Sequence, residues 1–279
     1  MLPRRFAQID VFSSESCRGN PVAVVLESDD LDDATMQRFA RWTNLSETTF
    51  VLPPTTEEAD YRLRIFTPGG ELPFAGHPTL GSCAAWLGSG GRPRTADRIV
   101  QECGIGLVEL RRDGGSLAFA APPLLRSGEP TPEELDAAVR ALRVDPAKVR
   151  AASWVDNGPG WMGLLLDSAE TVLSLEPDFV AMGTLKVGVA APSPAGADSD
   201  FEVRAFVPGI GVPEDPVTGS LNAGLASWFL SAGIASGPYV AAQGTALGRA
   251  GRVTVTPTRT GEIWIGGATS TVISGTVLL

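Results

Sequence analysis

Glu47 is the carboxylate best placed for proton chemistry, because it stands beside an otherwise apolar segment. It lies in Asn44-Leu45-Ser46-Glu47-Thr48, directly before the strand-like run 48–52. A carboxyl group against apolar surroundings tends to have a raised pKa, which suits a general acid or base. On the local sequence alone, an exposed loop position is the simpler interpretation. Glu47 is therefore a hypothesis that needs support from other residues.

Two short segments place a glycine where an apolar helical stretch begins. They are Gly76-His77-Pro78-Thr79 and Thr218-Gly219-Ser220-Leu221. The N–H groups at a helix start lack partners and the helix dipole is positive there, so a carboxylate or an oxyanion can bind. Each segment alone is more typical of an ordinary strand-to-helix turn, but a repeated pair favours anion binding. The predicted substrate-binding residues are Gly76, His77, Gly219 and Ser220.

Two further side chains could assist. His77 is the single histidine of the chain, and an ordinary imidazole can give or take a proton near neutral pH. Asp215 precedes Pro216, where aspartate commonly starts a turn, although it also lies shortly before the second helix start. A structural role stays open for each of them. We take Glu47, His77 and Asp215 as the catalytic candidates.

The types of site that the sequence lacks also narrow the function. One histidine excludes a His-rich metal site and leaves little for a hydrolytic triad. The segments 104–106 and 209–211 lack the third glycine of a dinucleotide fingerprint, and there is no phosphate-binding P-loop. The sequence therefore predicts no metal and no cofactor.

Composition indicates a globular cytoplasmic protein. The chain has 279 residues, 43% hydrophobic and 19% charged, with a net charge of -10, which argues against nucleic acid as a partner and weakly against anionic membranes. Cys17, Cys83 and Cys103 are an odd number without CxxC spacing, as in a reducing compartment. There is no apolar run of the roughly 18 residues that a membrane-spanning helix needs, and no signal peptide.

Short β-branched runs between glycines and prolines predict a strand-rich fold with few helices. Helices are expected at 30–42 and from Thr131 to about Arg143, and at 78–87 and 221–230, where nearly every residue is apolar or small. A helix without a polar face is normally buried on every side. The expected strands are 9–12, 22–26, 48–52, 61–66, 99–100, 108–111, 117–120, 163–166, 185–190, 201–206, 253–256, 263–265 and 270–279.

The two apolar helices belong to an internal repeat. Arg64-Ile65-Phe66-Thr67-Pro68-Gly69 matches Arg204-Ala205-Phe206-Val207-Pro208-Gly209 at a separation of 140 positions. Gly76 then matches Gly219, and Gly81 matches Gly224, both at a separation of 143. Two copies predict duplicated halves rather than a solenoid, which needs at least three.

Four motifs in this order resemble those of the phenazine-biosynthesis isomerase (PhzF) family: Asn20-Pro21-Val22-Ala23-Val24, Asn44-Leu45-Ser46-Glu47-Thr48, Phe66-Thr67-Pro68 with Glu71-Leu72-Pro73-Phe74-Ala75-Gly76-His77-Pro78-Thr79, and Glu214-Asp215-Pro216-Val217-Thr218-Gly219-Ser220. The resemblance runs from about Phe6 to the C-terminus and is weakest over 126–196. It implies an α+β, diaminopimelate-epimerase-like fold, with two pseudo-symmetric halves that each curl a mostly antiparallel sheet around a central apolar helix.

The expected domains follow from that fold. The first is 1–120, with its central helix near 78–87 and a C-terminal strand at about 268–279 that completes it. The second is 121–267, with its central helix near 221–230. The active site is expected between them. A homodimer is expected from the family resemblance alone.

The resemblance also implies roles for the candidate residues. Glu47 would be the acid/base, His77 and Asp215 would assist, and the backbone of Gly76-His77 and Gly219-Ser220 would hold the substrate carboxylate. The best-known family reaction isomerises a dihydro-hydroxyanthranilate by moving a proton between ring carbons.

One departure from the wider fold family bears on the reaction. Diaminopimelate epimerases and proline racemases carry a cysteine before each central helix, whereas this chain has Ala75 or His77 at one position and the segment 215–219 at the other. A single carboxylate favours isomerisation over racemisation. We therefore predict a cofactor-independent isomerase acting on a small carboxylate. The alternatives are an epimerase or lyase of an amino-acid derivative, and a non-catalytic protein that binds small acids.

Overall fold

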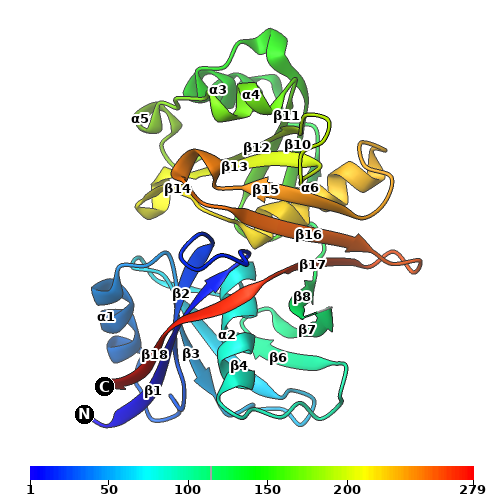
Figure 1. The fold of residues 1–279 in the computed structure, drawn as a ribbon. Helices are drawn as coiled ribbons and strands as arrows, with labels where there is room; N and C mark the ends of the chain where they lie inside the picture. Colours follow the sequence, from blue (N-terminus) through cyan, green and yellow to red (C-terminus); the bar gives the residue numbers. More distant parts are fainter. Residues whose placement is uncertain (114) are drawn as a thin grey trace. The chain divides into compact units, whose positions relative to one another are not determined.

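The computed structural model describes residues 1–113 and 115–279, and the chain divides into two compact units (Figure 1). Unit 1 contains residues 1–120 and 266–279, and unit 2 contains residues 121–265. The chain therefore leaves unit 1, builds unit 2 without interruption, and returns to unit 1 for its last strand.

Unit 1 is a mainly antiparallel sheet with one helix at its centre. β1 pairs antiparallel with β2 and β18, β2 runs parallel to β3, β3 is antiparallel to β4, and β4 is parallel to β6. Its elements are β1 (Pro3–Val11), β2 (Asn20–Val25), α1 (Asp33–Thr43), β3 (Thr48–Leu52), β4 (Tyr61–Phe66), β5 (Glu71–Leu72), α2 (Gly76–Gly88), β6 (Ile99–Cys103), β7 (Gly106–Asp113), β8 (Ser116–Ala120) and β18 (Thr269–Leu278).

Unit 2 repeats this pattern strand for strand. β10 pairs antiparallel with β9 and β11, β11 runs parallel to β12, β12 is antiparallel to β13, and β13 is parallel to β15. Its elements are β9 (Arg126–Gly128), α3 (Pro132–Leu142), β10 (Val149–Asp156), β11 (Trp161–Leu166), α4 (Ala169–Leu173), α5 (Phe179–Met182), β12 (Lys186–Pro192), β13 (Phe201–Val207), β14 (Val212–Asp215), α6 (Gly219–Ser231), β15 (Tyr239–Gln243), β16 (Gly251–Pro257) and β17 (Ile263–Gly267), which leads back to unit 1. The predicted α+β fold with two pseudo-symmetric halves is confirmed.

The central helices α2 and α6 have 13 residues each, and most of their side chains are buried. The repeat-related glycines explain how closely each helix packs on its strands. A Cβ atom on Gly81 would lie 2.3 Å from Val22 Cγ1, and one on Gly224 would lie 2.2 Å from the Val155 carbonyl oxygen. Larger residues would push each helix off its sheet.

Both central helices begin two residues earlier than the sequence predicted, at Gly76 and Gly219 instead of residues 78 and 221. Glycine has a low helix propensity, so it normally marks the outside of a helix. Here each glycine has helical backbone and forms part of the first turn. The predicted anion-binding segments therefore form the first turns of α2 and α6.

Side-chain caps define the outer helices. Asp32 accepts a hydrogen bond from the Thr35 backbone at the start of α1, which therefore begins at Asp33 rather than at residue 30. Thr131 and Glu134 form a reciprocal capping box at the start of α3, which begins directly after Thr131. α1 covers a core cluster with Met36, Phe39 and Ala40.

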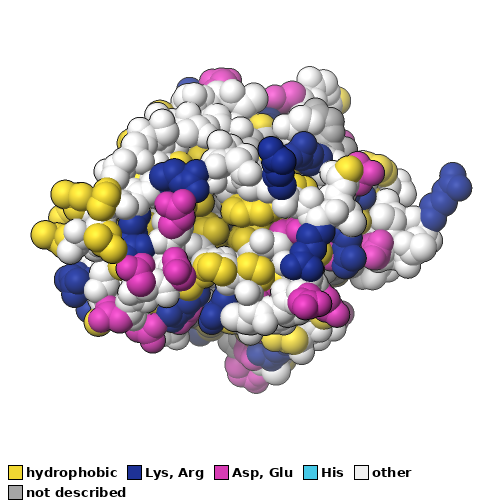
Figure 2. All heavy atoms as spheres, turned by 90° about the horizontal axis from the view of Figure 1, so that it is seen from below, with side chains coloured by type: hydrophobic (Ala, Val, Ile, Leu, Met, Phe, Trp, Pro, Cys, Tyr) yellow, Lys and Arg dark blue, Asp and Glu magenta, His cyan; other side chains and the backbone are white. Residues whose placement is uncertain are grey.

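Among the described residues, no helix is long and apolar enough to span a membrane. On the face shown in Figure 2, basic and acidic side chains are interspersed around a hydrophobic centre.

Candidate active site

Glu47 and His77 meet in the interior of unit 1. Glu47 directly precedes β3 and is 9% exposed, while His77 is the second residue of α2 and is 3% exposed. The His77 Nε2 and Glu47 Oε2 atoms are 3.4 Å apart, slightly longer than an ordinary hydrogen bond. The interpretation of Glu47 as an exposed loop residue is therefore wrong. Its neighbours in the fold, which the local sequence does not reveal, bury it.

The second ring nitrogen of His77 is held by the start of β2. The Asn20 side-chain nitrogen lies 3.3 Å from His77 Nδ1, and the ring also has a hydrogen bond with the Pro21 backbone. Asn20 is 1% exposed. The Asn20-Pro21 motif is apparent in the sequence, but its contact with His77, 57 positions away, is not. A buried asparagine at the start of a strand is the signal that could have identified it as a positioning residue.

Burial lowers the pKa of His77 to about 3, and the hydrogen bond with the Pro21 backbone opposes this only in part. The near-neutral pKa that the sequence suggested is therefore wrong, because an imidazolium in this site would lose its hydration. His77 is a neutral ring at neutral pH. Beside Glu47 it can serve as a hydrogen-bonding partner of the carboxyl group.

The starts of α2 and α6 differ in their capping from those of α1, α3, α4 and α5. α1, α3, α4 and α5 have N-cap side chains that accept a hydrogen bond from the first turn. The N-cap residues of α2 and α6, Ala75 and Thr218, make no such bond. The first-turn N–H groups of these two helices therefore have no N-cap side chain to accept from them, and an anion can take that role. These are the two helices that the sequence singled out.

Thr218 could cap α6, but its hydroxyl has other partners. It donates to Asp215 Oδ2 at 2.5 Å and accepts from Gln243 Nε2 at 2.9 Å. Gln243 Oε1 in turn accepts from the Thr218 backbone N–H at 3.0 Å and from Asn222 Nδ2 at 2.8 Å. This network fixes the backbone between Asp215 and the helix. Asp215 thus has the turn-forming role expected from the sequence, while Gln243 and Asn222 were missed.

Ser220 lies in the first turn of α6 and is 7% exposed. Trp161 Nε1 donates to its hydroxyl at 3.1 Å, and Asn157 Nδ2 donates to its carbonyl at 2.9 Å. Both donors come from β11 and the loop before it, so the sheet positions this helix start. Aromatic and amide donors spread over 60 residues give no local sequence motif.

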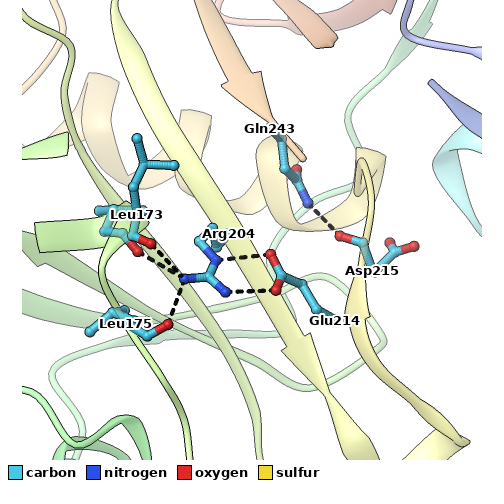
Figure 3. Close-up of polar contacts among 7 residues, drawn as sticks. Leu173, Leu175, Arg204, Glu214, Asp215 and Gln243 are labelled. Atoms are coloured by element: carbon cyan, nitrogen blue, oxygen red, sulfur yellow. Dashed lines mark hydrogen bonds and ion pairs between the residues drawn. The ribbon is translucent and has the colours of Figure 1, made fainter. Parts of the chain in front are cut away.

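β14 is anchored by a buried ion pair (Figure 3). Arg204 donates to both carboxylate oxygens of Glu214, at 2.9 Å and 2.8 Å, and both side chains are 7% exposed. Arg204 Nη1 also donates to backbone carbonyls at the end of α4, including Leu175 at 2.9 Å. Gln243 Nε2 donates to the Asp215 carbonyl at 3.1 Å. Arg204 and Gln243 therefore fix the last two residues of β14, Glu214 and Asp215.

The cysteines do not stand at the helix starts. Cys83 lies within α2, and burial raises the pKa of its thiol to about 12. Cys17 is exposed and Cys103 is partly buried. Among the described residues, no three His, Cys, Asp or Glu side chains are grouped to hold a metal ion. The groups available for proton transfer at α2 are therefore the carboxylate and the imidazole.

Comparison with known proteins agrees with this geometry. Residues 9–275 match the family model of the phenazine biosynthesis-like proteins, PhzC-PhzF. Antisense-enhancing sequence 1 of Schizosaccharomyces pombe is 40% identical over 294 aligned positions, covering 99% of each chain. The trans-2,3-dihydro-3-hydroxyanthranilate isomerase of Pseudomonas aeruginosa is 39% identical over 227 positions, covering 80% of this chain and 78% of that one.

A solved structure extends the likeness to the whole fold. The PhzF-family protein of Enterococcus faecalis superposes with a TM-score of 0.82 at 26% identity, covering 100% of both chains. The resemblance seen in the sequence motifs is confirmed. This chain belongs to the phenazine biosynthesis-like PhzC-PhzF family and is an isomerase.

Proposed function

We propose that this isomerase moves a proton within a small cyclic carboxylate resembling trans-2,3-dihydro-3-hydroxyanthranilate, with Glu47 as the single acid/base and without a cofactor. The observation that carries this is the buried pair of Glu47 and His77, 3.4 Å apart at the start of a helix that no N-cap side chain closes. The name of the Pseudomonas aeruginosa relative supports the substrate class.

In this mechanism, the first-turn N–H groups at Gly76 and His77 hold the substrate carboxylate, because they are oriented donors at the positive end of α2. Glu47 removes a proton from an adjacent acidified carbon and returns it to another carbon of the same ring. Positioned acid/base catalysis contributes about 10²–10⁴-fold to the rate. Stabilisation of the charge that develops on the substrate adds to this.

His77 contributes as a neutral ring. Proline has no backbone N–H, so the Pro21 carbonyl accepts from the ring, and among the described residues Nε2 has no hydrogen-bond partner. The ring proton is therefore on Nδ1, and the unprotonated Nε2 faces Glu47. This nitrogen can accept a hydrogen bond from the carboxyl group of Glu47 when that group carries the substrate proton, and a neutral ring leaves the carboxylate free to take it. An imidazolium at this distance would lower the basicity of Glu47.

Asp215, Gly219 and Ser220 enter this proposal through the second uncapped helix start. The α6 start repeats the features of the α2 start, and the network around Gln243 holds Asp215 beside it. We assign to Gly219 and Ser220 the binding of a polar group of the substrate, and to Asp215 an assisting role.

The positions of the cysteines bear on one alternative, an epimerase that uses two thiols as its bases. Neither helix start has a cysteine at the position of a catalytic thiol. Cys83, with a pKa of about 12, stays protonated at neutral pH and cannot accept a proton. The observations therefore favour one carboxylate and a proton shift within the substrate.

The test is proton NMR of trans-2,3-dihydro-3-hydroxyanthranilate in D₂O with the wild-type protein, the Glu47→Gln variant and the Glu57→Gln variant. Glu57 is an exposed glutamate of the same unit, so it controls for the loss of one carboxylate. We expect the wild type and Glu57→Gln to rearrange the diene, with deuterium appearing at one ring carbon. Glu47→Gln should be at least 100-fold slower.

Rearrangement by wild type and Glu47→Gln at the same rate would remove Glu47 from the mechanism. No reaction with wild type would remove this substrate. A panel of cyclic amino and hydroxy acids, followed by solvent deuterium incorporation and by optical rotation, would then separate isomerisation from epimerisation.

A further inference from the structure

Unit 2 contains a cavity of about 900 Å³ whose wall includes a buried carboxylate. It is lined by the start of α4, by the connection from β12 to β13, and by parts of β15 and β16. Glu202 of β13 contributes the carboxylate. None of the residues assigned above to the isomerase reaction lines this cavity.

Glu202 is buried without full pairing. The residue is 7% exposed, and among the described residues its Oε1 atom has no hydrogen-bond partner. Desolvation raises the pKa of Glu202, opposed by a hydrogen bond with Thr245 and by the charges of Arg252 and Arg204, while Asp198 adds to the rise. A buried carboxylate with an unsatisfied oxygen costs free energy that a donor in the cavity would recover.

The internal repeat shows how the same pair of strand positions differs in charge between the two units. In unit 1, the equivalent of Glu202 is Arg62, which stands opposite Glu102 in the parallel register of β4 and β6. In unit 2, Glu202 stands opposite Ala242 in the parallel register of β13 and β15. Unit 1 thus places opposite charges at this pair of positions, and Arg62 helps to lower the pKa of Glu102. Unit 2 has a carboxylate facing a methyl group, and both line the cavity.

The cations nearest to Glu202 are already paired with other acids. Arg204 donates twice to Glu214. Arg252 donates to both oxygens of Asp198, including two contacts of 2.9 Å from Nη2. The cavity wall further contains the acidic side chains Asp167 and Glu170. The surroundings of Glu202 are therefore short of positive charge, which disfavours an anionic ligand.

We propose that this cavity binds a small organic cation through a primary ammonium group, which donates to Glu202 and supplies the opposite charge that Ala242 does not. An ammonium group supplies the missing donor as well as the missing charge. The described residues offer no cluster of His, Cys, Asp or Glu for a bare metal ion. An alkyl chain of a few carbons fits against Ala242 and the prolines at the end of β12.

The test is calorimetric titration of the full chain with 1,4-diaminobutane at pH 7.5, with 1,4-butanediol as the uncharged probe of the same length. We expect the diamine to bind and the diol to bind at least tenfold more weakly. Glu202→Gln should weaken diamine binding at least tenfold, whereas Glu176→Gln, an exposed glutamate of unit 2 outside the cavity, should leave it unchanged.

A second measurement does not depend on the variant folding. Amide resonances of wild-type protein labelled with ¹⁵N should shift at Ala242 and Thr245 on addition of the diamine and not of the diol. Equal binding of diamine and diol would overturn the assignment. So would diamine binding that Glu202→Gln leaves intact, or shifts confined to residues outside the cavity.

Discussion

The starts of α2 and α6 are the same structural element with different chemistry. His77 and Ser220 are equivalent in the repeat, 143 positions apart, and both follow a glycine in an uncapped first turn. At α2 the buried neighbours are a carboxylate and an imidazole, Glu47 and His77. At α6 they are hydroxyl, amide and indole groups, whose hydrogen bonds fix the backbone. Duplication preserved the scaffold, and one copy retained groups that can exchange protons.

The strands before the two helix starts, β4 and β13, share the same chemistry but differ in its burial. Arg64 in β4 is ion-paired with Glu71, and Arg204 in β13 is ion-paired with Glu214, at matching positions. Each arginine also lies over a phenylalanine ring, at 5.1 Å and 4.9 Å. The pair in unit 1 is 16% and 41% exposed, whereas the pair in unit 2 is 7% and 7% exposed. The same contact is thus partly a surface feature in one unit and a core feature in the other.

The largest expected effect concerns the division of chemistry between the helix starts. With the substrate proposed above, Glu47→Gln should reduce kcat by about 10²–10⁴-fold. Asp215→Asn should reduce kcat/KM by about tenfold, because it removes charge from a hydrogen-bonded group without removing the acid/base. Steady-state kinetics followed by absorbance would measure both. A greater loss of kcat in Asp215→Asn than in Glu47→Gln would reverse the comparison.

The second prediction compares the ion pairs. Glu214→Gln leaves a buried guanidinium without its counter-charge, so it should lower the free energy of unfolding by about 3 kcal/mol. Glu71→Gln affects a more solvated pair and should lower it by less than about 1 kcal/mol. Urea unfolding followed by tryptophan fluorescence would measure both variants. Similar losses would mean that burial does not separate the two pairs.

The third prediction follows from the pKa of His77, which is about 3 in the native protein and about 6.5 in an unfolded chain. The native state therefore binds fewer protons between these values, and stability falls as the pH falls through this window. From pH 8 to pH 5, His77 should account for a loss of about 2 kcal/mol. Urea unfolding at pH 8 and pH 5 would measure this loss, and the free energy of unfolding of His77→Gln should depend less on pH than that of the wild type.

NMR provides an independent check, because His77 is the single histidine. Its ring protons should keep constant chemical shifts from pH 8 to pH 5 in the native state. A titration centred near pH 6.5 would contradict the buried neutral ring.

The smallest predicted effect compares the repeat-related glycines. Gly224→Ala would place Cβ 2.2 Å from a backbone carbonyl, whereas the nearest atom at Gly81 belongs to a side chain, Val22. Overpacking costs about 1–3 kcal/mol, offset by the gain of about 1 kcal/mol from alanine in a helix. We expect a net loss of about 1 kcal/mol for Gly224→Ala and less for Gly81→Ala. Thermal unfolding would rank them, and the reverse order would contradict this packing.

Much of the fold was predictable because its patterns are local. The strand predicted at 61–66 is β4, in which Tyr61, Leu63 and Ile65 are buried. The apolar helices and the start of α3 were also apparent in short segments. β10 and β15 were missed because their centres contain Ala, Ser and Gln instead of β-branched residues. α4 and α5 have five and four residues, too short for a helical period.

The candidate site was predictable only where it coincides with motifs. Glu47, His77 and Asp215 stand in recognisable segments, but their surroundings come from distant parts of the chain. Asn20 contacts His77 across 57 positions, and Gln243 reaches Asp215 across 28. The pKa of His77 depends on burial by the whole of unit 1, which no local pattern records. Residue types were therefore accessible from the sequence, and protonation states were not.

The return of the chain to unit 1 has a consequence for its biosynthesis. β18 pairs along the whole of β1, yet residues 121–265 are made between the body of unit 1 and this strand. At ribosomal rates of about 5–20 residues per second, the synthesis of unit 2 alone delays the partner of β1 by roughly 7–30 s. During that time its edge is open to strands of other nascent chains. Unit 2 is contiguous and can fold as it emerges, so the half that contains Glu47 and His77 is the last to be completed.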